Sequence, residues 1–469
     1  MCLATALLLG GGPPGTGAQG VSVARPALPA PRPYRLPAVR EQTLPNGLRI
    51  VVVERHDLPL VVVRTVFLAS PAGADPPGKE GAFGLMRALI ADATVTRPAD
   101  SLGARFATMG SRVSDSGFVT TTADFDSSTT ILADMLMHPR LAPDPFMAAR
   151  ARRVAVVRQA AASANLITTQ ILTATLFGSG HPFARFESET SLAAVGLEDV
   201  VASHAEWVRS ATTALVVVGD VTPERAFARV AAAFGSWSTP RAGQVPASGA
   251  SVAPPPTAIY LTDLPGPNAW IVAGMLTPSR DSPDMPALDV LNAVYGALTG
   301  SRLSRELRDN RGLAYTSPSA FLRRPVPAPS MLYSLLPAIA PDRVDSAVSV
   351  LLRELRGIAG ERPPGTGEFD DARDNRIASL PLQLETHEAL ARQLSDLLQQ
   401  NLPPESIDRN ALRLASLTRD QVIAVARADL HADRVAVVIA GDVAALEPRL
   451  RRANLAPVYI VDANGRRLR

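Results

Sequence analysis

Cysteine is almost absent from this chain of 469 residues, since Cys2 is the only one. A single thiol allows no disulfide within the chain and no zinc site built from several cysteines. Lysine is equally scarce. The one lysine, Lys79, does not lie in the G-x-x-x-x-G-K-[ST] pattern of phosphate-binding loops. The G-x-S-x-G pattern of many serine hydrolases is also missing. These absences argue against thiol, phosphate-loop and nucleophile-elbow chemistry.

Charge and histidine content argue against nucleic-acid binding and against a metal site. The formal net charge is +3, and no basic run with interleaved aromatic residues occurs, so we expect no nucleic-acid partner. The six histidines are scattered, with no pair one helical turn apart, which predicts no metal site and no cofactor. With 46% hydrophobic and 19% charged residues, the chain has ample material for large cores.

The first forty residues have the composition of a leader and a tether. Residues 1–18 begin with a short apolar run and continue with small residues, which predicts a signal peptide. Residues 19–40 are rich in proline and predict a semi-extended tether. This pattern favours export to a periplasm. A mitochondrial transit peptide is the alternative, because arginines recur there and no acidic residue precedes Glu41. No later apolar stretch is long enough to span a membrane.

An internal repeat organises the rest of the chain. Residues 195–200 and 215–221 reappear as 417–422 and 437–443, both at an offset of 222 residues. Each copy predicts a helix followed by a buried strand that ends in Gly-Asp-Val. A repeat this long indicates duplicated domains. Residues 239–257, rich in proline, alanine, glycine and serine, predict a linker between a domain at 41–238 and another at 258–469.

The order of elements predicts the fold class. In the first half we expect strands at 48–54, 60–69, 118–125 and 214–218, and helices at 81–92, 98–109, 127–137 and 143–163. Strands and helices in blocks indicate an α+β fold, in which each duplicated domain is a mostly antiparallel sheet with helices packed on one side.

Residues 79–90, which follow two predicted strands, resemble the zinc-site helix of the pitrilysin-type (M16) metallopeptidases. That family carries H-x-x-E-H, in which two histidines bind zinc and the glutamate activates water. Here the corresponding positions are Gly84, Arg87 and Ala88, and the positions of the acidic residues on a later helix are Arg153 and Ala160. None of these side chains can ligate a cation. The resemblance therefore implies a member without the zinc motif, with no catalytic residue and no metal ligand.

Residues 300–315 resemble the family's C-terminal signature, in which a short helix is followed by G-L-A-Y at the start of a strand. Residues 44–48 and 180–183 resemble the turns L-x-N-G-L and G-H-P-[FY] of the same family. Two interpretations of the basic segment remain open. Its arginines are either a solvated helix face with local ion pairs, or they contact a bound peptide that adds to a sheet edge. The candidate peptide-binding residues are Arg302, Arg305, Arg308 and Tyr315.

The resemblance also implies a function. Members of this family often work in pairs, in which one subunit carries zinc and the other completes the chamber. We therefore expect a non-peptidase member that pairs with a zinc-bearing M16 homologue and helps to enclose peptides or unfolded segments. The alternatives are a stand-alone peptide-binding or scaffold protein of the same fold, and an enzyme with a non-standard site.

Overall fold

The first half of the chain builds a six-stranded sheet in the order β1-β2-β6-β3-β5-β4. The computed structural model describes residues 35–68, 71–114, 117–237 and 253–469, so the predicted signal peptide and most of the predicted tether and linker lie outside the described residues. All strand pairs of this sheet are antiparallel except β2 and β6. The strands are β1 (Val39–Thr43), β2 (Arg49–Glu54), β3 (Leu60–Phe67), β4 (Arg112–Ser114), β5 (Gly117–Thr121) and β6 (Thr213–Gly219).

The second half repeats this sheet in the order β12-β7-β11-β8-β10-β9. The strands at the offset of 222 residues, β6 and β11, occupy the same place and are buried along their whole length, which confirms the duplicated fold. The outer strand differs, because β12 runs parallel to β7 whereas β1 runs antiparallel to β2. The strands are β7 (Ala258–Asp263), β8 (Ala269–Ser279), β9 (Ser319–Leu322), β10 (Pro329–Ile339), β11 (Ala436–Gly441) and β12 (Val458–Val461).

One face of each sheet is covered by helices of its own half, as the sequence predicts. Amphipathic spacing accounts for this, since the helix at Pro223–Phe234 (α9) buries Ala226, Val230 and Phe234 at intervals of four residues. The first sheet carries α2 (Ala82–Ile90), α3 (Ala99–Thr108), α4 (Phe125–Met137), α5 (Pro143–Ala160), α8 (Leu197–Trp207) and α9 (Pro223–Phe234). The second carries α10 (Met285–Asn292), α12 (Val344–Ala359), α13 (Thr366–Gln383), α16 (Arg419–Asp429) and α17 (Val443–Ala453).

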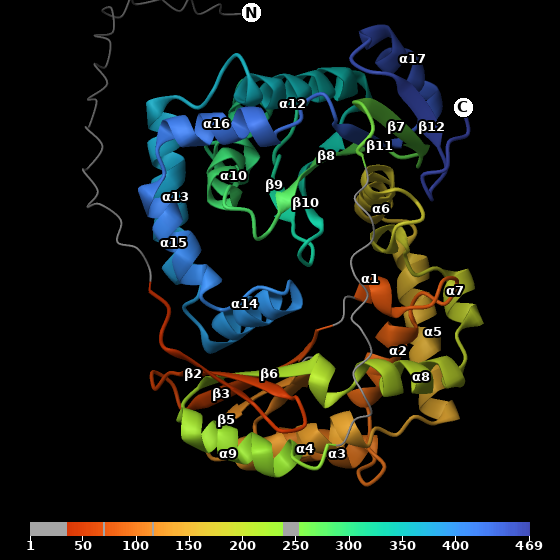
Figure 1. Cartoon of the computed structure of the whole chain (residues 1–469). Helices are drawn as coiled ribbons and strands as arrows, with labels where there is room; N and C mark the ends of the chain where they lie inside the picture. The colour runs from red at the N-terminus through yellow and green to blue at the C-terminus, as the bar shows by residue number, and fades with distance from the viewer. Residues whose placement is uncertain (1–34, 69–70, 115–116, 238–252) are drawn as a thin grey trace, which may run out of the picture. The chain divides into compact units, whose positions relative to one another are not determined.

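The opposite face of each sheet is covered as well, by a helix from the other half of the chain (Figure 1). Helix α14 (His387–Gln399) packs Leu390 and Leu394 against the valines of the first sheet. Helix α6 (Ala164–Phe177) packs Ile171 and Leu172 against the second sheet. The expectation of helices on one side only is thus incomplete. Burial on both faces explains why the central strands are almost continuously apolar.

Two predicted strand limits change. The predicted strand at 118–125 ends at Thr121, because a turn in which the Asp124 backbone N–H donates to the Thr121 carbonyl leads directly into α4. The Gly312–Tyr315 segment, expected to open a strand, precedes β9, which begins at Ser319. Within the described ranges no single helix is long and apolar enough to cross a membrane. Only α5 and α6 taken together meet that criterion, and they are bent by 90°.

Candidate functional site

Helix α2 presents a face of small residues where the resemblance places the zinc-binding histidines. Its apolar residues, among them Leu85, Met86 and Leu89, are buried and fix the orientation of the helix. Gly84 and Ala88 are exposed, and a spacing of four residues puts them on the same face. Arg87 is half-buried, with its guanidinium carbon 5.9 Å from the centre of the Phe67 ring. Neither small residue offers an atom that could ligate a metal.

A carboxylate from a distant segment lies against this face. Arg153 of α5 donates from Nε to Oε2 of Glu187 at 2.5 Å, and Glu187 is 22% exposed. The other oxygen, Oε1, lies 3.2 Å from the point where a Cβ on Gly84 would stand. A side chain with a Cβ at position 84 would therefore press against the Glu187 carboxylate, which would have to shift slightly. The Arg153–Glu187 ion pair thus lies beside the position where the sequence predicts that the zinc ligands are missing.

The zinc that the M16 resemblance implies does not fit these residues. The side chain of Ala160, at the end of α5, has no atom that can ligate a metal, and the guanidinium of Arg153 would repel a divalent cation. In the part of the chain that the structure describes, no group of three or more His, Cys, Asp or Glu side chains is arranged to hold a metal ion.

Arg302, the first predicted peptide-binding residue, is buried and bonded within its own half. It opens the short helix α11 (Arg302–Ser304) and donates to both carboxylate oxygens of Glu368, at 2.9 and 2.6 Å. It also donates to the carbonyls of Arg362, at 2.6 Å, and Pro363, at 3.1 Å. Burial alone would raise the pKa of Glu368, but the hydrogen bonds from Arg302 and the Gly365 N–H outweigh it and hold that pKa at about 2. Of the two interpretations of this arginine segment, the contacts of Arg302 agree with local ion pairing rather than with contact to a peptide.

The other three predicted peptide-binding residues are more accessible. Arg305 is half-exposed and donates to Glu368 Oε1 at 2.8 Å. Arg308 pairs with the adjacent Asp309 at 2.7 Å. Tyr315 is 87% exposed, which is unusual for so large a ring. Peptide binding by these residues stays a prediction.

Comparison with known proteins agrees with this architecture. Residues 194–376 match the family model described as the peptidase M16 inactive domain. The chain is 25% identical, over 340 residues, to an uncharacterized zinc protease of Mycobacterium leprae, which covers 70% of this chain and 75% of that protein. Among solved structures, the peptidase M16 inactive domain from Pseudomonas fluorescens superposes with a TM-score of 0.78 at 20% identity, covering 86% of this chain and 98% of that chain. A protease from Helicobacter pylori gives a TM-score of 0.76 at 20% identity, covering 86% and 100%.

The chain has the fold of M16 peptidase structures, and its residues 194–376 match the M16 inactive-domain model. The matched model is that of the inactive domain, and the positions of the M16 zinc motif in the first half are Gly84, Arg87 and Ala88. These findings support a non-catalytic M16 homologue.

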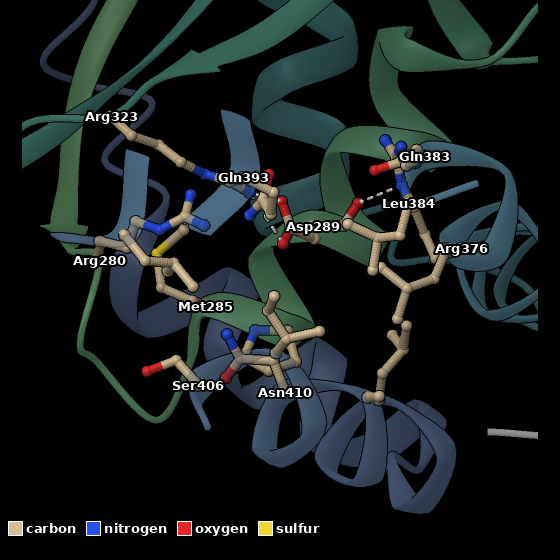
Figure 2. Close-up of a pocket in the computed structure, with 16 residues that line it drawn as sticks. Arg280, Met285, Asp289, Arg323, Arg376, Gln383, Leu384, Gln393, Ser406 and Asn410 are labelled. Atoms are coloured by element: carbon tan, nitrogen blue, oxygen red, sulfur yellow. Dashed lines mark hydrogen bonds and ion pairs between the residues drawn. The ribbon is translucent and has the colours of Figure 1, made fainter. Parts of the chain in front are cut away.

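The second half of the chain contains a pocket of about 240 Å³ lined by α10, α13, α14 and α15 (Ser406–Ser416). Its charged side is shown in Figure 2, where Asp289 lies between Arg323 and Arg376. Arg323 donates from Nη2 to both oxygens of Asp289, at 2.8 and 3.0 Å, and Arg376 donates from Nε to the main-chain oxygen of the same residue, at 3.4 Å. The third arginine, Arg280, makes no hydrogen bond or ion pair with any described residue, and its Nε is buried.

The electrostatics of the pocket follow from burial. Burial, together with the positive charge of Arg323, lowers the pKa of Arg280 to about 10. The pKa of Arg376 is lowered too, again chiefly by burial. Arg280 stays protonated at neutral pH, so an incompletely compensated cation lines the pocket.

Sequence reasoning missed Glu187 and the pocket arginines. Glu187 lies in an irregular segment with no periodic signal. Arg280 and Arg323, by contrast, directly follow β8 and β9. Both strands are antiparallel to β10, so their carboxyl ends lie at the same end of the sheet. Polar residues at the ends of two such strands were the available signal.

Proposed function

We propose that this chain is the non-catalytic member of a pair with a zinc-bearing M16 peptidase, and that it helps to enclose peptide substrates. The observation that carries the proposal is the contrast between fold and motif. Both sheets keep the same strand order, yet the exposed face of α2 carries Gly84 and Ala88 beside an internal Arg153–Glu187 ion pair. Retention of the whole scaffold without the ligands favours a role in binding and assembly.

Peptide contact is assigned to the accessible side of the second half. Strand β9 is the last strand of its sheet, so its outer edge can accept an extended segment by β-augmentation. Tyr315, four residues before β9, offers an exposed aromatic ring, and Arg305 offers a half-exposed guanidinium on the segment that precedes it. Main-chain pairing would supply affinity that depends little on the peptide's sequence.

The test is a pull-down of the tagged mature chain from the periplasmic fraction of its source cells. The periplasmic fraction is used because export to the periplasm is part of the proposal. Zinc content and peptidase activity are measured on the eluate. A zinc-bearing homologue and activity that elute together support the pair. A chain that elutes alone, and that leaves the rate of a purified zinc-bearing homologue unchanged, contradicts it and favours a stand-alone peptide-binding or scaffold protein.

Variants sharpen this experiment. Tyr315→Ala with Arg305→Gln is expected to weaken the binding of an unfolded peptide several-fold, because both proposed peptide contacts are removed. Leu412→Ala, at an exposed leucine of α15, is the matched control and is expected to bind as the unaltered chain does. Equal peptide binding by all three proteins would place the peptide elsewhere.

A further inference from the structure

The pocket beside Asp289 has an excess of positive charge that the described residues do not neutralise. Its charged lining residues are Arg280, Arg323, Arg376 and Asp289, which sum to two positive charges. Asp289 is already bonded to Arg323 through both carboxylate oxygens. The fixed charges therefore leave Arg280 without a partner of its own.

The surroundings of Arg280 do not remove this imbalance. Asp396 of α14 is a second carboxylate whose charge acts on Arg280, but the charges of Arg64 and Arg392 act on Asp396 too. With these residues included, the cluster still has more arginines than carboxylates. Arg280 is half-buried, and its buried Nε has no hydrogen-bond partner among the described residues, so the site favours the arrival of an anion.

The rest of the lining is apolar or neutral. Leu380, Leu397, Ile407 and Leu414 supply apolar surface, and Gln383, Gln393 and Asn410 supply amide groups. A volume of about 240 Å³ is below the usual range for drug-sized ligands, about 300–1,000 Å³, so the occupant is small.

We propose that this pocket binds a carboxylate attached to a small apolar group, with the carboxylate on Arg280 and the apolar group against the leucines. A guanidinium suits this role because its planar fork can donate two parallel hydrogen bonds to a carboxylate. Two sources share this chemistry: a free short-chain carboxylic acid, and the C-terminal residue of a peptide that ends in an apolar amino acid. The proposal concerns the second half alone and does not depend on pairing with a zinc-bearing partner.

The experiment is isothermal titration calorimetry on the mature chain with matched charged and neutral probes. Hexanoate represents the free acid. A peptide that ends in leucine represents the second source, and the same peptide with an amidated C-terminus lacks the carboxylate. Binding of either carboxylate without binding of the amide supports the proposal and identifies the source. Equal binding of the free and amidated peptides with no binding of hexanoate overturns it.

Variants assign the contact to Arg280. Arg280→Gln is expected to weaken carboxylate binding about tenfold to a hundredfold, which is the value of a charge-assisted hydrogen bond. Arg324→Gln is the matched control, because Arg324 is also half-buried but lies over the rings of Phe183 and Phe177, outside the pocket. Unchanged affinity in Arg280→Gln, or an equal loss in both variants, overturns the assignment.

A further variant separates loss of the site from loss of the fold. Ala411→Phe inserts a ring at another lining position of the pocket and leaves all four charged groups in place. It is expected to abolish binding, while the thermal unfolding profile shows that the chain is folded. A folded Ala411→Phe protein that binds the carboxylate with unaltered affinity contradicts the proposed location.

Discussion

Arg153 Nε lies 2.5 Å from Glu187 Oε2, and this ion pair places the other oxygen of Glu187 next to Gly84. Two segments more than thirty residues apart in the sequence thus meet at the corner where M16 peptidases carry zinc. The Arg153–Glu187 ion pair fills part of this region, so replacing the residues of the zinc motif alone does not restore a metal site.

We expect a chain with a rebuilt motif to bind zinc poorly as long as Arg153 is present. A histidine at position 84 would press against Glu187, which Arg153 holds, and the Arg153 guanidinium repels the cation. Adding Arg153→Gln should strengthen zinc binding at least tenfold, measured by calorimetric titration. The rebuilt motif consists of Gly84→His, Arg87→Glu, Ala88→His and Ala160→Glu.

A control on the same helix distinguishes this effect from a general loss of positive charge. Arg158 of α5 forms a similar exposed ion pair with Glu189. Arg158→Gln in the rebuilt chain should change zinc affinity much less than Arg153→Gln does. Equal gains from the two substitutions would mean that net charge, and not the displacement of Glu187, limits metal binding.

Arg302→Gln should destabilise the fold by about 3 kcal/mol, because it leaves Glu368 without its main partner in a largely buried site. Arg305→Gln removes only a half-exposed contact to the same carboxylate and should cost less than about 1 kcal/mol. Urea unfolding of the two variants measures the difference. Similar losses would show that Arg302 is not the buried anchor of this segment.

Glu368 makes the fold sensitive to acid. Its pKa is about 2 in the folded chain and has an ordinary value of 4.5, so the folded state favours the ionised form. The stabilisation is therefore fully present above pH 4.5 and is lost as the pH falls towards 2. The difference in unfolding free energy between the unaltered chain and Glu368→Gln should be constant near neutrality and shrink below pH 4.5. A difference that grows on acidification would contradict this.

Leu394→Ala should cost about 3 kcal/mol, because this fully buried side chain fixes α14 on the first sheet. We expect one cooperative transition in calorimetry rather than two, since α14 comes from the half that it does not cover. Leu412→Ala, 59% exposed on α15, should change stability by less than about 0.5 kcal/mol. Separate melting of the two halves in the unaltered chain would argue against this coupling.

Much of this fold could be predicted from local patterns. The valine runs of β2, β3 and β6 and the repeated Gly-Asp-Val ends indicate buried strands and a duplication without any knowledge of tertiary contacts. The exchange of helices could not be predicted in this way. Leu390, Leu394 and Leu397 identify an apolar face of α14, but their spacing does not say which sheet that face covers.

The same limit applies to the sites. Missing ligands can be read directly at Gly84, Arg87 and Ala88, because absence of a donor is a property of the residue itself. The position of Glu187 beside Gly84 depends on how the 185–188 segment returns to α2, and the position of Arg280 near Arg323 depends on strand order. Such contacts between distant residues have no signature in residue spacing.

The reciprocal placement of α6 and α14 also sets an order of events during synthesis. The first sheet is complete in the chain at Gly219, but the helix that covers its second face ends at Gln399. Until the ribosome has released that helix, the apolar row of Val51, Val53, Val62 and Val216 stays without its cover. A nascent chain with such a surface is a substrate for holding chaperones and for aggregation. Slow translation between these two points should therefore lower the yield of folded protein.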